Sequence, residues 1–253
     1  MSTQPTDPTV RHCLVTGASS GIGRAVAERL VADGWDVTVL VRRDLAPKGT
    51  RVVVGDAASP ADLQRAIEAA ADAVGALHGL VCAAGLPPSG PWDDTQHWAD
   101  VIRLDLTAAY DAARLAWPGL VAGSGSAVFV GSIVGAAEGS GRSPAYAAAK
   151  AGLEGLARSL AVIGGADSVR VNVVAPGAID TPFDTLAFPA DARPDVPLGR
   201  MGTAAEVAAI VALLLSPESG YVTGATWRVD GGRSAVSPAA AATAAASANK
   251  ARG

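Results

Sequence analysis

Thr16-Gly17-Ala18-Ser19-Ser20-Gly21-Ile22-Gly23 joins a short apolar run to the start of a long helical pattern. Gly17 permits a tight bend, Gly21 allows a backbone to approach a pyrophosphate, and Gly23 allows the helix to pack closely on the strand. The free N–H groups at a helix start attract phosphate. Because the glycines lie between a strand and a helix, we expect a dinucleotide-binding βαβ unit here rather than a plain tight turn.

Short apolar runs alternate with longer helical patterns along the rest of the chain. We expect strands at 12–16, 36–41, 51–54, 79–83, 127–131, 169–174 and 226–229, and helices at 21–33, 61–74, 94–121, 145–163 and 204–215. Continuously apolar strands that alternate with helices indicate a parallel sheet covered on both faces. The sequence therefore predicts an α/β protein with a single Rossmann domain, a doubly wound parallel sheet of seven strands. Residues 42–50 are too few for a helix, so the second and third strands are expected to be joined almost directly.

Composition excludes several classes of protein. The chain has 253 residues, 49% hydrophobic and 17% charged, with a net charge of −4. No basic run suggests nucleic-acid binding, and no apolar stretch is long enough to cross a membrane. We expect residues 1–9 and 234–253 to be disordered, residues 10–233 to form the domain, and the setting to be cytoplasmic. Cys13 and Cys82 lie in apolar runs and are expected to be buried free thiols, and the histidines show no metal-ligand spacing.

The end of the second predicted strand selects the cofactor. An acidic residue there favours NAD, whereas arginine accommodates the extra phosphate of NADP. The chain has Arg42 and Arg43 at this point, so we expect NADP(H), although Asp44 could neutralise one guanidinium. Asp56 follows the third strand and could meet the adenine amino group or cap a turn.

Tyr146 and Lys150 lie four residues apart in a predicted helix, so they share one face. A nearby ammonium stabilises a phenolate and lowers the phenol pKa. The pair could therefore exchange protons near neutral pH, as a general acid or base must. By itself such a pair is usually an ordinary helix neighbour, and its meaning depends on the glycine turn upstream.

Residues 10–233 resemble the short-chain dehydrogenase/reductase family. The elements that carry the resemblance occur in family order: Thr16-Gly17-(x)3-Gly21-Ile22-Gly23, Cys82-Ala83-Ala84-Gly85, Ser132, Tyr146-(x)3-Lys150, Pro176-Gly177 and Val229-Asp230-Gly231-Gly232. Each motif is weak alone, but the ordered set is specific.

The resemblance implies a role for each matching residue. Tyr146 would exchange the proton with the substrate. Lys150 would lower the pKa of Tyr146 and hold the nicotinamide ribose, and Ser132 would hydrogen-bond the substrate oxygen. Asp105 occupies a fourth catalytic position. The cofactor would contact Gly17, Ser19, Ser20, Gly21, Ile22, Gly23, Arg42, Arg43, Asp56, Ala57, Ala83, Ala84, Gly85, Tyr146, Lys150, Pro176, Gly177, Ile179 and Thr181. No metal is expected.

Two departures from the family pattern affect the site. The family usually has Asn-Asn-Ala-Gly where this chain has Cys82-Ala83-Ala84-Gly85, so bracing by asparagine side chains is lost. Asp105 stands where the family usually has asparagine, whose backbone carbonyl holds a water of the proton relay. The carboxylate could pair with Lys150 and weaken its pull on Tyr146, and it is either a relay participant or a structural substitute. We expect Asp105→Asn to leave activity at least intact.

The resemblance implies an NADPH-dependent enzyme that reduces a small-molecule ketone. The alternatives are an alcohol or dihydrodiol dehydrogenase, a 3-oxoacyl-carrier-protein reductase with a basic docking patch (Arg103, Arg114 and Arg142), and a non-catalytic NADP(H) sensor. Substrate contacts are expected from residues 86–92, Ile133, Val134 and residues 183–197. The alanine-rich long helices form dimer faces in the family, so we expect a homotetramer, or otherwise a dimer.

Overall fold

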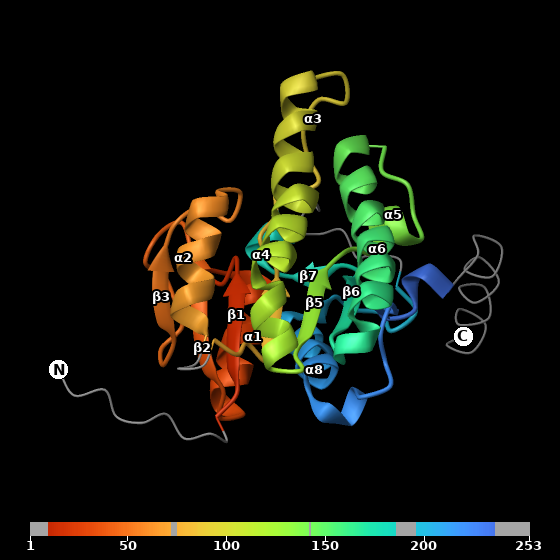
Figure 1. Cartoon of the computed structure of the whole chain (residues 1–253). Coiled ribbons are helices and arrows are strands. Elements are labelled where there is room, and N and C mark those ends of the chain that lie inside the picture. Colours follow the sequence, from red (N-terminus) through yellow and green to blue (C-terminus); the bar gives the residue numbers. More distant parts are fainter. Residues whose placement is uncertain (1–9, 72–74, 142, 186–195, 236–253) are drawn as a thin grey trace.

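A seven-stranded parallel sheet forms the centre of the molecule (Figure 1). The computed structural model describes residues 10–71, 75–141, 143–185 and 196–235. Its sheet has the order β3-β2-β1-β4-β5-β6-β9. The strands are β1 (His12–Thr16), β2 (Asp36–Val41), β3 (Arg51–Val54), β4 (Gly79–Cys82), β5 (Ser126–Val130), β6 (Arg170–Pro176) and β9 (Thr226–Val229). This order, with its reversal beside β1, is that of a doubly wound sheet, as the sequence predicts.

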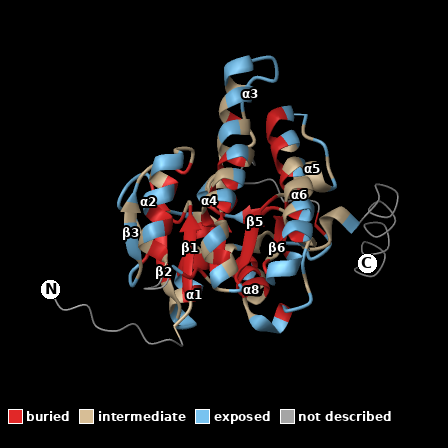
Figure 2. Ribbon diagram, in the orientation of Figure 1, coloured by how far each residue is buried: buried red, intermediate tan, exposed pale blue. Residues whose placement is uncertain are grey.

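Helices cover both faces of the sheet. The long helices are α1 (Gly21–Ala32), α2 (Pro60–Ala70), α3 (Thr95–Ile102), α4 (Ala108–Ala122), α6 (Pro144–Gly164) and α8 (Ala204–Leu215). Side chains of α2, α4 and α6 pack in one core cluster, and those of α1 and α8 pack in a second cluster on the opposite face. Figure 2 shows the buried residues along the strands and on the inner sides of these helices.

Short elements complete the described chain. They are α5 (Ile133–Ala136), α7 (Pro182–Thr185), the 3₁₀ turns η2 (Gly165–Asp167), η3 (Pro217–Ser219) and η4 (Arg233–Ala235), and a two-stranded ribbon of β7 (Ile179–Asp180) and β8 (Gly202–Thr203). Residues 42–50 contain no helix, so β2 and β3 are joined directly as expected. The expected disordered segment 1–9 and residues 236–253 of the expected tail lie outside the described residues, whereas Ser234 and Ala235 belong to η4.

Local chemistry explains where several helices begin. Ser59 accepts a hydrogen bond from the Asp62 N–H ahead of α2, and Ser143 accepts one from Tyr146 ahead of α6. In both helices a proline occupies the first turn, where its missing N–H costs nothing. Thr203 and Glu206 form a reciprocal capping box at α8.

The predicted helix 94–121 differs from the observed one. Residues Arg103–Thr107 form a π-helical segment, η1, between α3 and α4. A π segment widens the turn by one residue and often occurs at functional sites. Here it contains Asp105, whose side chain turns inward and is fully buried. The continuous helical pattern of the sequence carries no sign of this widening.

Both cysteines are free and buried, as expected from their apolar surroundings. Cys13 lies in β1 and Cys82 ends β4, and they belong to the two different core clusters. Among the described residues, no helix combines the length and the apolar character that a membrane crossing requires.

Candidate active site

The glycine turn after β1 has the backbone geometry that its sequence predicts. Gly17 and Gly21 have φ values of +74° and +56°, which side chains rarely allow. A Cβ on Gly23 would lie 2.5 Å from the carbonyl oxygen of Gly17. Ser20 precedes α1 without capping it through its side chain, so the first N–H groups of the helix remain available. The turn therefore has the geometry that can cradle a phosphate.

The loop that follows β4 lies directly against this turn. A Cβ on Gly17 would lie 2.6 Å from the backbone nitrogen of Ala84. The hydroxyl of Thr16 accepts hydrogen bonds from the N–H groups of Ala83 and Ala84, at 3.3 and 3.4 Å. The threonine thus supplies bracing that the alanines cannot supply themselves.

A cleft of about 400 Å³ opens at the carboxyl ends of the strands, where ligands bind in doubly wound sheets. Most of the predicted contacts line it: Gly17, Ser19, Ser20, Gly21, Ile22, Gly23, Arg42, Asp56, Ala57, Ala83, Ala84, Gly85, Ser132, Tyr146, Lys150, Pro176, Gly177, Ile179 and Thr181. Arg43 and Asp105 do not line this cleft. The glycine turn and the other predicted contact residues line one and the same cleft, and this arrangement fits a nicotinamide dinucleotide.

Arg42 and Asp56 lie at the end of the cleft formed by β2 and β3. Arg42 is exposed, and within the described part of the chain no ion pair links Asp44 to it. The Asp56 carboxylate accepts a hydrogen bond from the N–H of Ala58, and its other oxygen lies 3.9 Å from the guanidinium of Arg103. Asp56 therefore caps a turn and borders the cleft at once.

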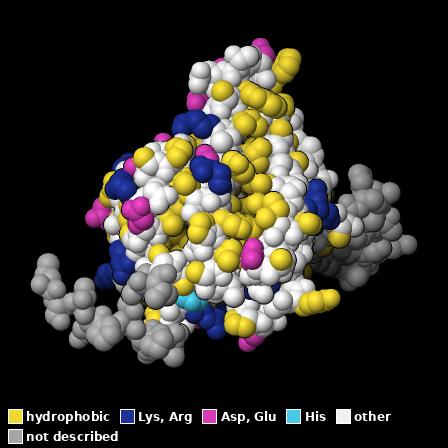
Figure 3. Space-filling view, viewed as in Figure 1, with side chains coloured by type: hydrophobic (Ala, Val, Ile, Leu, Met, Phe, Trp, Pro, Cys, Tyr) yellow, Lys and Arg dark blue, Asp and Glu magenta, His cyan; other side chains and the backbone are white. Residues whose placement is uncertain are grey.

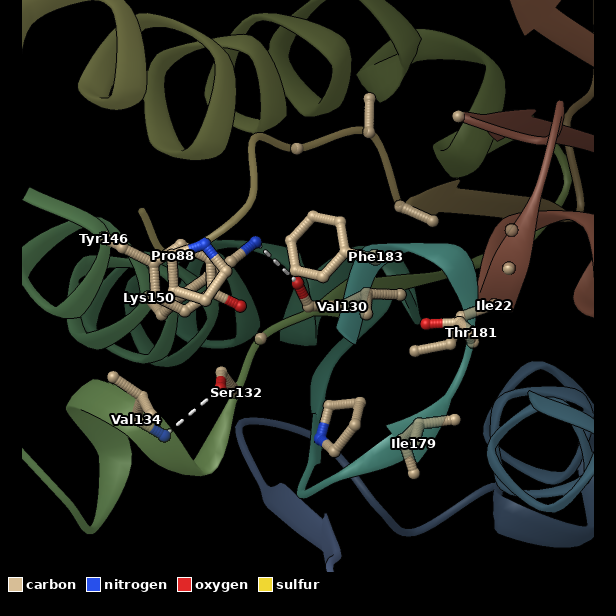
Figure 4. Close-up of a pocket in the computed structure, with 18 of the residues that line it drawn as sticks. Ile22, Pro88, Val130, Ser132, Val134, Tyr146, Lys150, Ile179, Thr181 and Phe183 are labelled. Atoms are coloured by element: carbon tan, nitrogen blue, oxygen red, sulfur yellow. Dashed lines mark hydrogen bonds between the residues drawn. The ribbon is translucent and has the colours of Figure 1, made fainter. Parts of the chain in front are cut away.

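Tyr146 and Lys150 lie in the first turns of α6 and face the cleft (Figure 4). Their side chains are almost fully buried, and the Lys150 ammonium lies 5.3 Å from the centre of the Tyr146 ring. The ammonium donates a hydrogen bond to the carbonyl oxygen of Val130, 3.2 Å away. The ring of Phe183 is 6.4 Å from that of Tyr146 and borders the same cavity.

Lys150 also forms a buried ion pair with Asp105. The ammonium and a carboxylate oxygen are 3.0 Å apart, with the side chains 6% and 0% exposed. Burial disfavours the ammonium, but the negative charge of Asp105, together with Tyr146, outweighs burial and raises the pKa of Lys150 above its ordinary value. Lys150 is therefore held firmly in its charged form.

Asp105 has a second contact that the sequence did not indicate. Its other carboxylate oxygen accepts a hydrogen bond of 2.9 Å from the N–H of Leu86. A Cβ on Gly85 would lie 2.7 Å from the carboxylate, so only glycine fits there. Asp105 thus connects the loop after β4 to Lys150, and it lines a small cavity of about 10 Å³ behind the main cleft together with Lys150, Cys82 and Thr16.

Ser132 lies two residues beyond the end of β5 and opens α5. Its hydroxyl accepts a hydrogen bond from the N–H of Val134 at 3.1 Å, drawn in Figure 4. Gly135 at φ +92° packs the following turn against α6, where a Cβ would lie 2.3 Å from the carbonyl of Ala147. This contact ties the serine to the helix that carries Tyr146.

Sequence reasoning missed one charged pair in the cleft. Glu138, on the turn after α5, and Arg233, in η4 after β9, both line the cavity. The guanidinium donates two hydrogen bonds of 3.0 Å to the two carboxylate oxygens of Glu138. The signals were a glutamate followed by Gly139 and an arginine just after Gly231-Gly232, but 95 residues separate the two charges.

The chain is similar to several known proteins. A family model described as enoyl-(acyl carrier protein) reductase matches residues 17–234. The cis-4-hydroxycyclohexanecarboxylate dehydrogenase of Sinomonas cyclohexanicum is 40% identical over 247 residues, 89% of this chain and 97% of that protein. The 3-oxoacyl-[acyl-carrier-protein] reductase MabA of Mycobacterium tuberculosis is 38% identical, over 88% of this chain and 92% of that protein. The ligand-free aldohexose dehydrogenase of Thermoplasma acidophilum has a similar structure, with a TM-score of 0.84, 31% identity, and coverage of 90% of this chain and 96% of that one.

Proposed function

Because the chain belongs to the short-chain dehydrogenase/reductase family, and is thus an oxidoreductase of hydroxyl and carbonyl groups, we propose that it reduces a small-molecule ketone with NADPH. The observation that carries the proposal is the buried Tyr146–Lys150 pair in the same cleft as the glycine turn. The bound nicotinamide supplies the hydride.

The residues of the chain supply the proton and the geometry. In the proposed reaction Tyr146 donates its phenolic proton to the ketone oxygen, and Ser132 hydrogen-bonds that oxygen as its negative charge develops. Lys150 stays charged beside the phenol and stabilises it when the proton has left. Asp105 positions Lys150 and the loop before Leu86. Pro88, Val134 and Phe183 give the substrate end of the cleft an apolar wall.

Preference for NADPH rests on Arg42. It follows β2, lines the cleft and is exposed, whereas no acidic residue ends that strand. A guanidinium is suited to a ribose phosphate because it offers several N–H donors in one plane. The cytoplasm, where NADPH is kept as a reductant, is the setting that we propose.

A homotetramer is the assembly that we propose, with a dimer as the alternative. Figure 3 shows hydrophobic side chains along the middle of the face that α4 and α6 cover. Trp98 and Tyr110, on α3 and α4, are 45% and 46% exposed. Small alanine side chains on these helices allow a second copy to approach closely.

Reduction of a 3-oxoacyl carrier protein is the second candidate, because several similar proteins bear that name. Arg103 and Arg114 both lie next to carboxylates, at Asp56 and Asp111, and Arg142 lies outside the described residues. The partial neutralisation of the two described arginines favours a free small ketone.

Oxidation of NADPH with a panel of ketones and one 3-oxoacyl thioester tests the proposal. We expect turnover of at least one small ketone, reduced about 10²- to 10⁴-fold in Tyr146→Phe while NADPH still binds. Tyr221→Phe, at a fully exposed residue that does not line the cleft, is the matched control and should retain activity. No turnover of any carbonyl compound, with tight NADPH binding, would instead favour a cofactor sensor. Faster turnover of an alcohol with NADP⁺ would favour the oxidative direction.

A further inference from the structure

The substrate end of the cleft contains an ion pair that the proposed chemistry does not use. Glu138 and Arg233 both line the cavity that also contains Ser132 and Tyr146. Both N–H···O distances are 3.0 Å, so the guanidinium binds the carboxylate with two parallel bonds. Each side chain is 27% exposed, and a small molecule in the cleft can therefore reach the pair.

The other charges that line the described part of the cleft are already assigned. Arg42 and Asp56 lie at the end formed by β2 and β3, far along the cavity from the residues after β5. Lys150 is paired with Asp105. Arg233 is therefore the cation, among the described lining residues, that remains for a charged group on the substrate.

Arg233 is held in place by its own turn. The carboxylate of Asp230 accepts hydrogen bonds of 2.9 Å from the N–H groups of Gly232 and Ser234. The N–H of Arg233 donates to the carbonyl oxygen of Asp230 at 3.2 Å. The guanidinium thus extends into the cleft from a braced segment at the end of β9.

The backbone of Glu138 is held in place as well, because its N–H donates a hydrogen bond to the carbonyl oxygen of Ile133 and its own carbonyl oxygen accepts one from Gly135. The side chain is a different matter. Gly139 follows it directly, where a Cβ would meet no atom within 4 Å, and the carboxylate is 27% exposed. The Glu138 carboxylate can therefore rotate out of the pair without a movement of this backbone. Its departure would expose two N–H donors in the geometry that binds a carboxylate.

We propose that Arg233 binds a carboxylate group of the substrate, and that Glu138 occupies the same two donors until the substrate arrives. The substrate class is then a compact keto acid, an apolar ring or chain with a ketone at one end and a carboxylate at the other. Exchange of one carboxylate for another preserves both charge-assisted hydrogen bonds, whereas a neutral group cannot replace Glu138. This inference rests on the proposed function, because that function places the ketone beside Tyr146.

Binding of unreactive ligands tests the inference without turnover. Cyclohexanecarboxylate and cyclohexanecarboxamide have nearly the same shape and differ in charge. Each would be titrated calorimetrically into the complex of the enzyme with NADP⁺. We expect the wild type to bind the carboxylate more tightly, and Arg233→Gln to lower the ratio of the two affinities by about 10-fold or more, since a hydrogen bond to a charged group is lost.

The partner variant has the opposite expected effect. Glu138→Gln removes the competing charge and should raise the same ratio by about 3- to 10-fold. Arg158→Gln, whose guanidinium pairs with Glu154 on α6 and does not line the cleft, is the matched control and should leave the ratio unchanged. If Arg233→Gln does not fold, Glu138→Gln alone decides the question.

The inference is overturned if the wild type binds both ligands equally. It is also overturned if Arg233→Gln keeps the wild-type ratio, if Glu138→Gln fails to raise it, or if Arg158→Gln lowers it as much. Turnover of 4-oxocyclohexanecarboxylate and its amide separates this inference from the proposed function. Binding that depends on Arg233 without turnover of either ketone contradicts the proposed function alone, and turnover of both at equal efficiency contradicts the carboxylate site alone.

Discussion

Asp105→Asn tests how the buried carboxylate acts on the proposed proton donor. The substitution removes the negative charge beside Lys150 but keeps an oxygen that can accept the hydrogen bond from Leu86. The ammonium lies 5.3 Å from the Tyr146 ring centre, so at an effective dielectric of about 20 it stabilises a charge there by roughly 3 kcal/mol. The carboxylate oxygen is 3.0 Å from that ammonium and therefore at most about 8 Å from the ring centre. Its negative charge destabilises a phenolate there by at least about 2 kcal/mol, and so opposes the effect of the ammonium.

Removal of the carboxylate should therefore move the pH dependence of the reaction. A change of 2 kcal/mol corresponds to about 1.5 pH units. Without the opposing charge the phenol loses its proton more readily. In the oxidative direction the rising limb of kcat/KM against pH should shift to lower pH by about 1 to 1.5 units, and in the reductive direction the falling limb should shift equally. At neutral pH the activity should stay at least intact.

The same variant should be less stable, because it leaves the Lys150 charge buried without its partner. Such a loss costs about 3 to 5 kcal/mol in other proteins. For a chain of this size the melting temperature would fall by roughly 6 °C or more. Asp111→Asn is the matched control, because Asp111 pairs with the half-exposed Arg114 one turn along the same helix, α4, and it should change neither property.

Two results would refute this reasoning. An unchanged pH profile, together with the loss of stability, would show that the carboxylate has only a structural role. A loss of activity by orders of magnitude at all pH values in a folded variant would show that the carboxylate itself takes part in proton transfer.

Three further predictions concern other parts of the structure. Arg42→Ala should weaken NADPH binding by about 10- to 100-fold with little change for NADH, because a charge-assisted contact is lost; Arg43→Ala, outside the cleft, is the control, and equal losses for both cofactors would contradict the assignment. Burial, partly opposed by the charge of Lys150, raises the pKa of Cys82 to about 12, so the native protein at pH 8 should react with a thiol reagent far more slowly than the unfolded protein, and fast labelling would disprove this burial. Hydrogen bonds from Arg200 and Thr203 lower the pKa of Glu206 from 4.5 to about 2, so its contribution to stability is complete above about pH 4.5 and is lost as the pH falls toward 2. The difference in melting temperature between wild type and Glu206→Gln should therefore narrow below pH 4.5, and a difference independent of pH would refute it.

Much of the fold could be predicted because its local signals agree with its tertiary structure. Four predicted strands, 12–16, 36–41, 51–54 and 226–229, have the observed bounds, since each run of strand-forming residues ends where turn residues begin. In the other three strands of the large sheet the ends moved by one or two residues. β4 ends at Cys82 because the N–H groups of Ala83 and Ala84 bond the Thr16 side chain instead of a neighbouring strand.

Residues that line the cleft were predicted where a motif is contiguous in sequence. The glycine turn and the Tyr146–Lys150 pair are local patterns, and both line the observed cleft. The possible pairing of Asp105 with Lys150 was also foreseen, from the unusual aspartate. Its bond to Leu86 was not, because that contact depends on the π-helical segment, which no local pattern signals.

Contacts between segments that are distant in the chain could not be predicted from the amino-acid sequence. Glu138 and Arg233 each look like an ordinary surface charge in sequence, and only the folded chain brings the turn after α5 next to the end of β9.

The close contact between Gly17 and Ala84 has a consequence for any attempt to redesign this enzyme. The turn that would carry the cofactor phosphates and the segment leading to Gly85 touch backbone to backbone, and Thr16 bonds the second to the first. The glycine turn cannot be widened unless the loop after β4 moves as well, and the same holds in reverse. A substitution chosen to admit a different nucleotide would therefore also displace the Asp105–Lys150 ion pair. Libraries that vary the two loops together should contain more active clones than libraries that vary either loop alone.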